Sequence, residues 1–256
     1  MKKKQIAVQL YTLREYLKTP ADIAQTLKRV RQIGYEAVQV SGMGPIAEEE
    51  LTEILDDNGL MCVATHENGV SIIEQPGKIV ERLSKLKCKY TAFPSPGKID
   101  ISTTKAVLEL AKKLNAAGKV LHEAGMTLLY HNHSIEFIRV DGKLILDLIY
   151  DNTDPRYLQG EPDTYWLQHG GGDPVAWCKK LAGRLPIIHL KDYKIVEPRT
   201  PDYAEIGNGN LNWKEIIPEA EKAGCKWFCV EQDTCPGDPF DSLKISFDYI
   251  AKNFCD

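Results

Sequence analysis

The sequence predicts a single (β/α)8 barrel, the TIM-barrel fold, and three observations lead to this prediction. Short apolar runs alternate with longer amphipathic ones, and eight such pairs fit into 256 residues. No linker or shift in composition divides the chain, so one domain is expected over residues 1–256. The Gly-x-Gly-x-x-Gly pattern of nucleotide-binding open sheets does not follow the first apolar run, which disfavours a doubly wound sheet.

The expected strands are eight short apolar runs. They cover residues 5–11, 36–41, 60–66, 90–94, 126–132, 157–163, 186–192 and 226–232. The segments between them carry apolar residues three and four positions apart, which is typical of amphipathic helices. Residues 102–124 form the longest of these, and they open with Ser and Thr residues suited to capping. Four glycines stand just before an expected strand, where a left-handed residue commonly ends a helix: Gly34, Gly59, Gly125 and Gly224.

Composition narrows the class of protein. The chain is 43% hydrophobic and 27% charged with a net charge of −4, so it lacks the basic surface that nucleic-acid phosphates require. No apolar stretch approaches the roughly 20 residues of a membrane span, and the run after "MKKK" is too short for a signal-peptide core. We expect a cytoplasmic enzyme without nucleic-acid or membrane partners; a secreted protein whose leader was removed is the alternative. Whether it is a monomer or a homo-oligomer stays open.

The seven cysteines do not predict a disulfide framework or a thiolate metal site. Their number is odd, and no two of them form a Cys-x-x-Cys pair. We expect reduced, mostly buried thiols.

Residue types that bind metals stand at the ends of four successive expected strands. The segment "YHNHSIEF", residues 130–137, follows one strand, and Asp163, His189 and Glu231 end the next three. The carboxyl ends of barrel strands meet on one face, where active sites lie. A single histidine there would more often be structural, but the repeated pattern favours one divalent ion. Manganese is preferred, with zinc, cobalt or magnesium as alternatives.

The predicted metal ligands are His131, Asp163, His189 and Glu231. His131 is chosen because it comes first as its strand leaves the core, and His133 shares its strand face. Glu136 is the alternative: it could be a ligand, a substrate clamp, an acid/base group or an ordinary loop carboxylate.

Other polar residues at the same face are candidates for substrate binding. Lys191 could bind a substrate oxygen, offset charge near the metal, or pair with Asp192 or another carboxylate. Tyr11, His66 and Trp166 could form a wall against a sugar, or only pack. The segment "GNGNLNW" predicts a loop rich in turn residues rather than a phosphate cradle. An unphosphorylated sugar or inositol derivative is therefore the expected substrate.

Six segments occur in the order found in one known superfamily: "AVQLYTLREYL", "IGYEAVQV", "YHNHSIEF", "IIHLKD", "EIGNGNLNWKEII" and "VEQD". Over nearly its whole length the chain resembles the sugar phosphate isomerase/epimerase superfamily, which has a xylose-isomerase-like barrel. The resemblance implies that Asp163, His189 and Glu231 are the last three of four metal ligands. The first family ligand, a glutamate, falls on His131 here.

That departure bears on the reaction, because the family epimerases use their first and last metal-binding glutamates as the acid/base pair. The "YHNH" variant is similar to the branch that contains inosose dehydratases and enzymes acting on 3-keto sugars. Gln39 stands where a glutamate is common, and Trp166 lies where many epimerases carry a substrate-binding histidine.

The expected activity is enolisation of a keto sugar or keto-inositol. A metal would polarise the carbonyl, and a base would remove the adjacent proton. Glu231 is the first candidate for the base, with His131, His133 or Glu136 as the opposite acid/base group. A carboxylate facing a histidine is a chemically unequal acid/base pair, unlike the two glutamates of the epimerases. Such a pair favours elimination or hydration slightly over epimerisation or isomerisation. Two rivals are a catalytically inactive carbohydrate-binding barrel and a relative of abasic-site endonucleases; the second would need more ligands and a basic groove.

Overall fold

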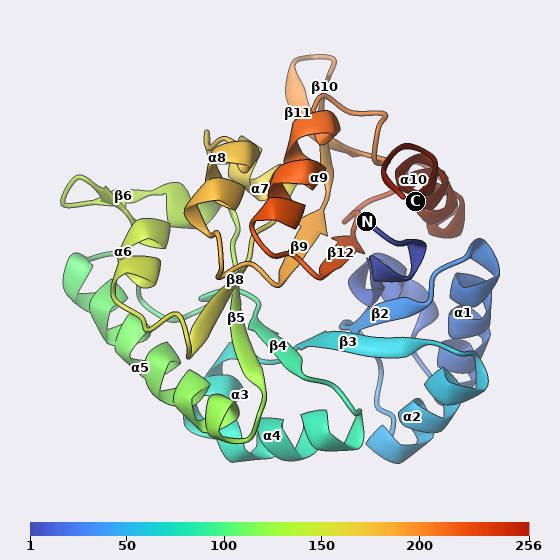
Figure 1. The fold of residues 1–256 in the computed structure, drawn as a ribbon, viewed down its shortest axis with the longest axis horizontal. Helices are drawn as coiled ribbons and strands as arrows, with labels where there is room; N and C mark the ends of the chain where they lie inside the picture. The colour runs from blue at the N-terminus through green and yellow to red at the C-terminus, as the bar shows by residue number, and fades with distance from the viewer. Residues whose placement is uncertain (256) are drawn as a thin grey trace.

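Eight parallel strands form the centre of the molecule, and helices surround them (Figure 1). The structure, a computed structural model, describes residues 1–255. The barrel strands are β1 (Ile6–Gln9), β2 (Ala37–Val40), β3 (Met61–His66), β4 (Tyr90–Phe93), β5 (Thr127–His131), β8 (Leu158–Glu161), β9 (Ile187–Leu190) and β12 (Trp227–Val230). Each lies inside one of the eight predicted runs, so the predicted barrel is confirmed.

The strands pair in the order β8-β5-β4-β3-β2-β1-β12-β9. The two outermost strands, β8 and β9, meet through a parallel bridge between Asp163 and His189. There the His189 amide donates to the Pro162 carbonyl oxygen at 2.9 Å. The seam of the barrel therefore lies between two residues that the sequence marks as metal ligands.

Helices cover the outside of the barrel (Figure 1). They are α1 (Pro20–Ile33), α2 (Glu48–Asp57), α3 (Gly69–Glu74), α4 (Pro76–Lys85), α5 (Thr104–Glu123), α6 (Ile145–Asp151), α7 (Thr164–His169), α8 (Pro174–Lys180), α9 (Trp213–Lys222) and α10 (Pro239–Phe254), with 3-10 turns η1 (Lys3–Gln5), η2 (Leu10–Tyr16) and η3 (Ser134–Phe137). The Thr103 hydroxyl caps α5 by accepting from the Ala106 amide, as the sequence predicted. In residues 1–255, none of the helices combines the length and hydropathy that a membrane crossing needs.

Two antiparallel hairpins interrupt the β/α repeat, and the sequence pattern did not predict them. One is β6 (Arg139–Val140) with β7 (Lys143–Leu144), and the other is β10 (Asp192–Val196) with β11 (Thr200–Ala204). The second hairpin follows β9 directly, so it stands beside the carboxyl-terminal face of the barrel.

The barrel interior changes from small apolar side chains to polar ones along each strand. The apolar layer consists of Ala7, Ala37, Val63, Ala64, Ala92, Leu129, Ile187 and Cys229. Alternate residues of a strand face the same side, so the inward residue two positions after Ala37 is Gln39. In the same way His131 follows Leu129, and His189 follows Ile187. The small residues of this layer, such as Ala7 and Ala37, leave room for the larger polar groups that lie nearer the carboxyl-terminal face of the barrel.

Asp192 organises the predicted loop of residues 207–213. Its carboxylate accepts hydrogen bonds from the Gly207, Gly209 and Leu211 amides at 2.9–3.2 Å, and from Trp213 Nε1 at 2.7 Å. The loop is rich in turn residues, as expected, and three of its amides bind this internal carboxylate.

Gly118 should be required where α5 approaches the chain before β8. A Cβ added at this glycine would lie 2.0 Å from the Tyr157 carbonyl oxygen, so Gly118→Ala should lower the free energy of unfolding by about 1–3 kcal/mol despite alanine's higher helix propensity. Gly77→Ala in α4 is the matched control, because its added Cβ meets nothing within 4 Å. Urea denaturation measures both variants, and equal stability of the two would contradict this packing account.

Candidate metal centre and cavity

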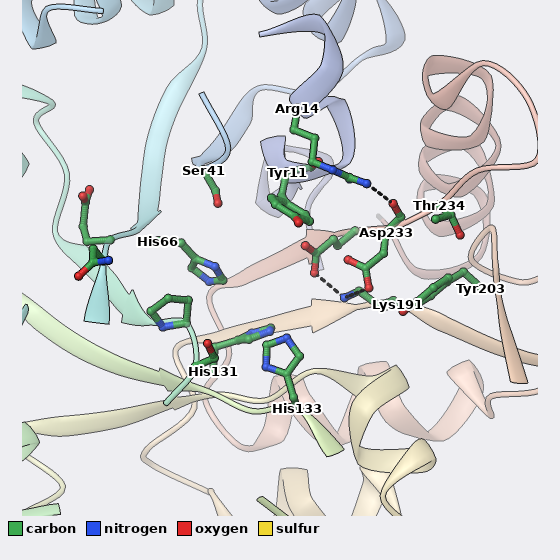
Figure 2. Close-up of a pocket in the computed structure, with 15 residues that line it drawn as sticks. Tyr11, Arg14, Ser41, His66, His131, His133, Lys191, Tyr203, Asp233 and Thr234 are labelled. Atoms are coloured by element: carbon green, nitrogen blue, oxygen red, sulfur yellow. Dashed lines mark hydrogen bonds and ion pairs between the residues drawn. The ribbon is translucent and has the colours of Figure 1, made fainter. Parts of the chain in front are cut away.

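A cavity of about 590 Å³ opens at the carboxyl-terminal face of the barrel. Figure 2 shows His66, His131 and His133 on one side of it, and Lys191, Tyr203 and Asp233 on the other. Glu231 and Tyr11 also line it. The cavity therefore lies where the sequence predicts a site.

The four predicted ligands come together, and two of them, His131 and Glu231, line this cavity. His131, Asp163, His189 and Glu231 are buried, and each offers one donor atom within 4.8 Å of the others. Asp163 Oδ2 lies 4.0 Å from His131 Nε2 and 3.9 Å from His189 Nδ1. His189 Nδ1 lies 3.0 Å from Glu231 Oε2. We call these four residues the upper set.

Local structure orients Asp163 toward this set. Its Oδ1 atom accepts from the Trp166 amide at 3.0 Å and caps α7, while its own amide donates to Asn132 Oδ1 at 3.2 Å. Its Oδ2 atom is buried without a hydrogen-bond partner among the described residues, although Lys191 Nζ is an ion-pair neighbour at 3.0 Å. Burial raises the pKa of Asp163 to about 6, with Lys191 opposing the shift. An oxygen held this way fits a bound cation.

Lys191 brings a buried positive charge to the upper set. Its ammonium lies 2.8 Å from Glu231 Oε2, 3.0 Å from Asp163 Oδ2 and 3.2 Å from Asp233 Oδ2. Burial lowers the pKa of this lysine, but the three carboxylates outweigh it and hold the pKa well above the ordinary value. The sequence left open whether Lys191 pairs with Asp192 or with another carboxylate. In the structure it pairs with Glu231, Asp163 and Asp233, whereas Asp192 binds the loop of residues 207–213.

A second donor set lies below the first, and the sequence analysis missed its central residue, Glu161. Glu161 Oε2 lies 2.6 Å from His66 Nε2, 3.5 Å from His131 Nδ1 and 3.4 Å from His189 Nε2. These four residues, the lower set, could also hold a metal ion by their spacing. The alternation of side chains along a strand could have identified Glu161. It stands two residues before Asp163, so both side chains face the same side.

The two sets share His131 and His189, and each imidazole turns one nitrogen to each set. Burial and the nearby His189 lower the pKa of His131. For His189, burial is outweighed by Glu161 and Glu231, which raise its pKa to about 10. The two histidines therefore differ in charge although they occupy similar positions.

The structure separates the other candidates of the "YHNHSIEF" segment. His133 lines the cavity, and burial together with Lys191 lowers its pKa to about 4, so its ring is neutral at pH 7. Glu136 does not line the cavity: its carboxylate accepts from the His133 amide at 2.8 Å and from the Tyr130 hydroxyl at 3.0 Å. Burial raises the pKa of Glu136 to about 7.

The predicted substrate wall is only partly assembled. Tyr11 and His66 line the cavity, but Trp166 does not; its ring centroid lies 5.2 Å from that of His133. Tyr203, which lies in the unpredicted β10–β11 hairpin, supplies an aromatic face to the cavity. Lys191 Nζ lies 5.9 Å from the centroid of the Tyr203 ring. A short, polar hairpin gave no sequence signal for this contribution.

Known proteins resemble the chain in sequence and in fold. An inosose dehydratase from Clostridium tetani is 27% identical over 161 residues, which are 56% of this chain and 53% of that protein. The chain thus spans about half the length of the curated relatives it matches. A sugar phosphate isomerase/epimerase from Parabacteroides distasonis superimposes with a TM-score of 0.84 at 26% identity, covering 98% of this chain and 99% of the other.

A probable 3-DHS dehydratase from Bacillus anthracis shares the fold at 16% identity, with a TM-score of 0.73 and coverage of 99% and 100%. The family described as "Xylose isomerase-like TIM barrel" matches residues 27–252. That match covers most of the sequence, and the fold agrees with it. This protein belongs to the xylose isomerase-like TIM barrel family.

Proposed function

We propose that this protein is a divalent-metal-dependent enzyme that enolises a keto sugar or keto-inositol, and that elimination or hydration beside the ketone follows. The observation that carries the proposal is the upper set, whose four donor atoms lie within 4.8 Å of one another and two of whose residues, His131 and Glu231, line the cavity. Two imidazoles and two carboxylates suit manganese best, with zinc, cobalt or magnesium as alternatives. Asp163 Oδ2, which is buried and has no hydrogen bond to the described residues but already faces the Lys191 ammonium, supports a cation at this point.

A bound ion would supply Lewis-acid polarisation of the substrate carbonyl. Lys191 competes for the same oxygens, because it contacts Asp163 and Glu231 directly. Asp233 lies at 3.2 Å on its cavity side and can keep the ammonium there when a cation shares the other two carboxylates. Lys191 would then face the substrate.

Glu231 is the proposed base. Burial would raise its pKa, but Lys191 and His189 outweigh burial and hold the pKa well below the ordinary value, so the carboxylate is ionised. It would take the proton from the carbon beside the carbonyl. In elimination, the electrons of that C–H bond form a C=C bond, and the β-hydroxyl leaves as water after receiving a proton.

The proton that Glu231 has taken is the one proposed to pass to the leaving hydroxyl, which restores the carboxylate. His133 and His131, whose pKa values are lowered by burial, are proposed to hydrogen-bond that hydroxyl. Both line the cavity opposite Lys191 (Figure 2). Glu136 is the weakest of the earlier candidates, because it lies behind His133 and bonds to its amide. His66, Tyr11, Tyr203 and Trp166 are proposed to contact the sugar or to support the residues that do.

The cavity supports an unphosphorylated substrate. Of its lining residues, Arg14 and Lys191 are the permanently charged cations. Arg14 donates to the backbone oxygens of Tyr11 and Asp233, both at 3.0 Å, and Lys191 is surrounded by carboxylates. These two cations are thus engaged with backbone oxygens and carboxylates, and the described lining residues include no cluster of cations for a phosphate.

Epimerisation or isomerisation is the second candidate, favoured by the name of the Parabacteroides distasonis protein that matches along the whole chain. The inosose dehydratase relatives favour elimination, and they match about half of their own length. Both reactions begin with the same proton removal, so product identity distinguishes them.

We expect the purified protein to hold about one divalent ion per chain, and Asp163→Asn to lose most of it. The substitution keeps the capping oxygen but removes the charge of the atom that faces the set. Elemental analysis of dialysed protein gives the metal content. Asp173→Asn is the control, because Asp173 also caps a helix, α8, but does not line the cavity. Full metal content in Asp163→Asn would argue against the upper set.

We expect Glu231→Gln to slow exchange of the α-proton with D2O by about 10²- to 10⁴-fold, the contribution of one general base. Proton NMR of 3-keto sugars and inosose follows exchange and products together. Glu67→Gln is the control, since Glu67 lines the cavity but pairs with Arg82 at 2.9 Å. An unsaturated or hydrated product supports elimination or hydration, whereas clean epimers would overturn that assignment.

A further inference from the structure

We infer that Gln39 and Glu161 form a relay that fixes the tautomer of His189, keeping its proton on Nε2 and leaving Nδ1 free to bind a metal. This inference rests on the proposed function, because it concerns how the upper set holds one of its ligands. Gln39 and Glu161 are positioning residues: they act on the metal through His189.

The first step of the relay is the contact between Glu161 and Gln39. Both side chains are fully buried inside the barrel. Glu161 Oε1 lies 2.7 Å from Gln39 Nε2. An ionised carboxylate can only accept hydrogen bonds, so the amide of Gln39 must present its NH₂ group to Glu161. The orientation of that amide, which is otherwise ambiguous, follows from its neighbour.

The second step is the opposite end of the same amide. Gln39 Oε1 lies 2.7 Å from His189 Nε2 and 3.2 Å from the Cys229 thiol, which donates to it. Because the carbonyl oxygen can only accept, His189 Nε2 must carry a proton. The thiol is a weak donor and is compatible with an oxygen at this end of the amide.

The third step is the remaining nitrogen of His189. In the metal-free protein His189 is protonated on both nitrogens, and Glu231 accepts from Nδ1. A divalent ion would displace the Nδ1 proton to water, while the proton on Nε2 stays with Gln39, so the lone pair of Nδ1 is the one left for the metal. That nitrogen points to Glu231 Oε2 at 3.0 Å and Asp163 Oδ2 at 3.9 Å. The relay therefore makes Nδ1 of His189 a ligand in the upper set. Glu161, which belongs to the lower set, orients the ring through Gln39.

His131 also lies between the two sets, but its Nδ1 makes no hydrogen bond to the described residues. Its Nδ1 faces Glu161 Oε2 at 3.5 Å, while its Nε2 faces Asp163 Oδ2 at 4.0 Å. One carboxylate thus lies beneath both imidazoles of the upper set. Histidines that bind metals commonly donate their second N–H to a carboxylate or carbonyl, and loss of such a partner lowers metal affinity about 10- to 100-fold.

The test uses protein with ¹⁵N-labelled histidines, alone and with Zn²⁺, in long-range ¹H–¹⁵N correlation spectra. In the wild-type zinc form we expect His189 to show a protonated Nε2 and a zinc-bound Nδ1. Glu161→Gln gives Gln39 a neighbour that donates as well as accepts, so the amide is free to turn over. We expect that variant to lose the single tautomer and to bind Zn²⁺ about 10- to 100-fold more weakly in competition with a chelator.

Gln39→Met removes the relay without changing Glu161 and should have the same two effects, which keeps the test decisive if Glu161→Gln does not fold. Gln9→Met is the matched control. Gln9 is buried beside Gln39 in the sheet, but its oxygen accepts from the Tyr11 amide and its Nε2 has no hydrogen-bond partner among the described residues. That variant should keep the wild-type spectrum and zinc affinity.

A zinc-bound Nε2 on His189 would overturn the inference in favour of an ion in the lower set. Unchanged tautomer and zinc affinity in both Glu161→Gln and Gln39→Met would also overturn it. If the wild-type protein binds no zinc or manganese, the proposed function fails, and the metal-free spectrum still tests the relay. It must then show a slowly exchanging Nε2 proton on His189 that Gln39→Met abolishes; absence of that proton contradicts the relay.

Discussion

Buried negative charge is the constraint on which this end of the barrel depends. Glu161, Asp163 and Glu231 lie almost completely out of water within one small volume. Removing a carboxylate from water costs several kcal/mol, so each needs a positive or hydrogen-bonding partner. Lys191 offsets Asp163 and Glu231, and the histidines surround Glu161. The sharing of these oxygens among a lysine, histidines and a divalent ion is the physical basis of the proposed site.

The same residues join the fold to the site. The barrel closes where Asp163 bridges to His189, so the strand ends that must meet to complete the sheet also bring two proposed ligands together. Asn132 adds to this by accepting from the Asp163 amide across from β5. Small side chains such as Ala7 and Ala37 fill the barrel below and leave the upper interior to polar groups. Stability and site geometry are therefore parts of one arrangement.

The sequence predicted the barrel well because each strand is an apolar run with its polar residue at the carboxyl end. The same signal led to the prediction of His131, Asp163, His189 and Glu231 as ligands, and the structure places these four side chains close together. Glu161 was missed because the predicted run extended to Asp163, whereas the strand itself ends at Glu161. Tyr203 and the cavity-facing role of the β10–β11 hairpin depend on tertiary contacts. Glu136 looked accessible in its loop, yet its hydrogen bonds turn it away from the cavity.

The position of a bound ion tests the central claim most directly. Crystals soaked in Mn²⁺ or Zn²⁺ and measured at the absorption edge of the metal would show that position as an anomalous peak. The account predicts one peak in contact with His131 Nε2, Asp163 Oδ2, His189 Nδ1 and a Glu231 oxygen, with Lys191 Nζ moved toward Asp233. A peak coordinated by Glu161 and His66, or no peak inside the barrel at saturating metal, would contradict it.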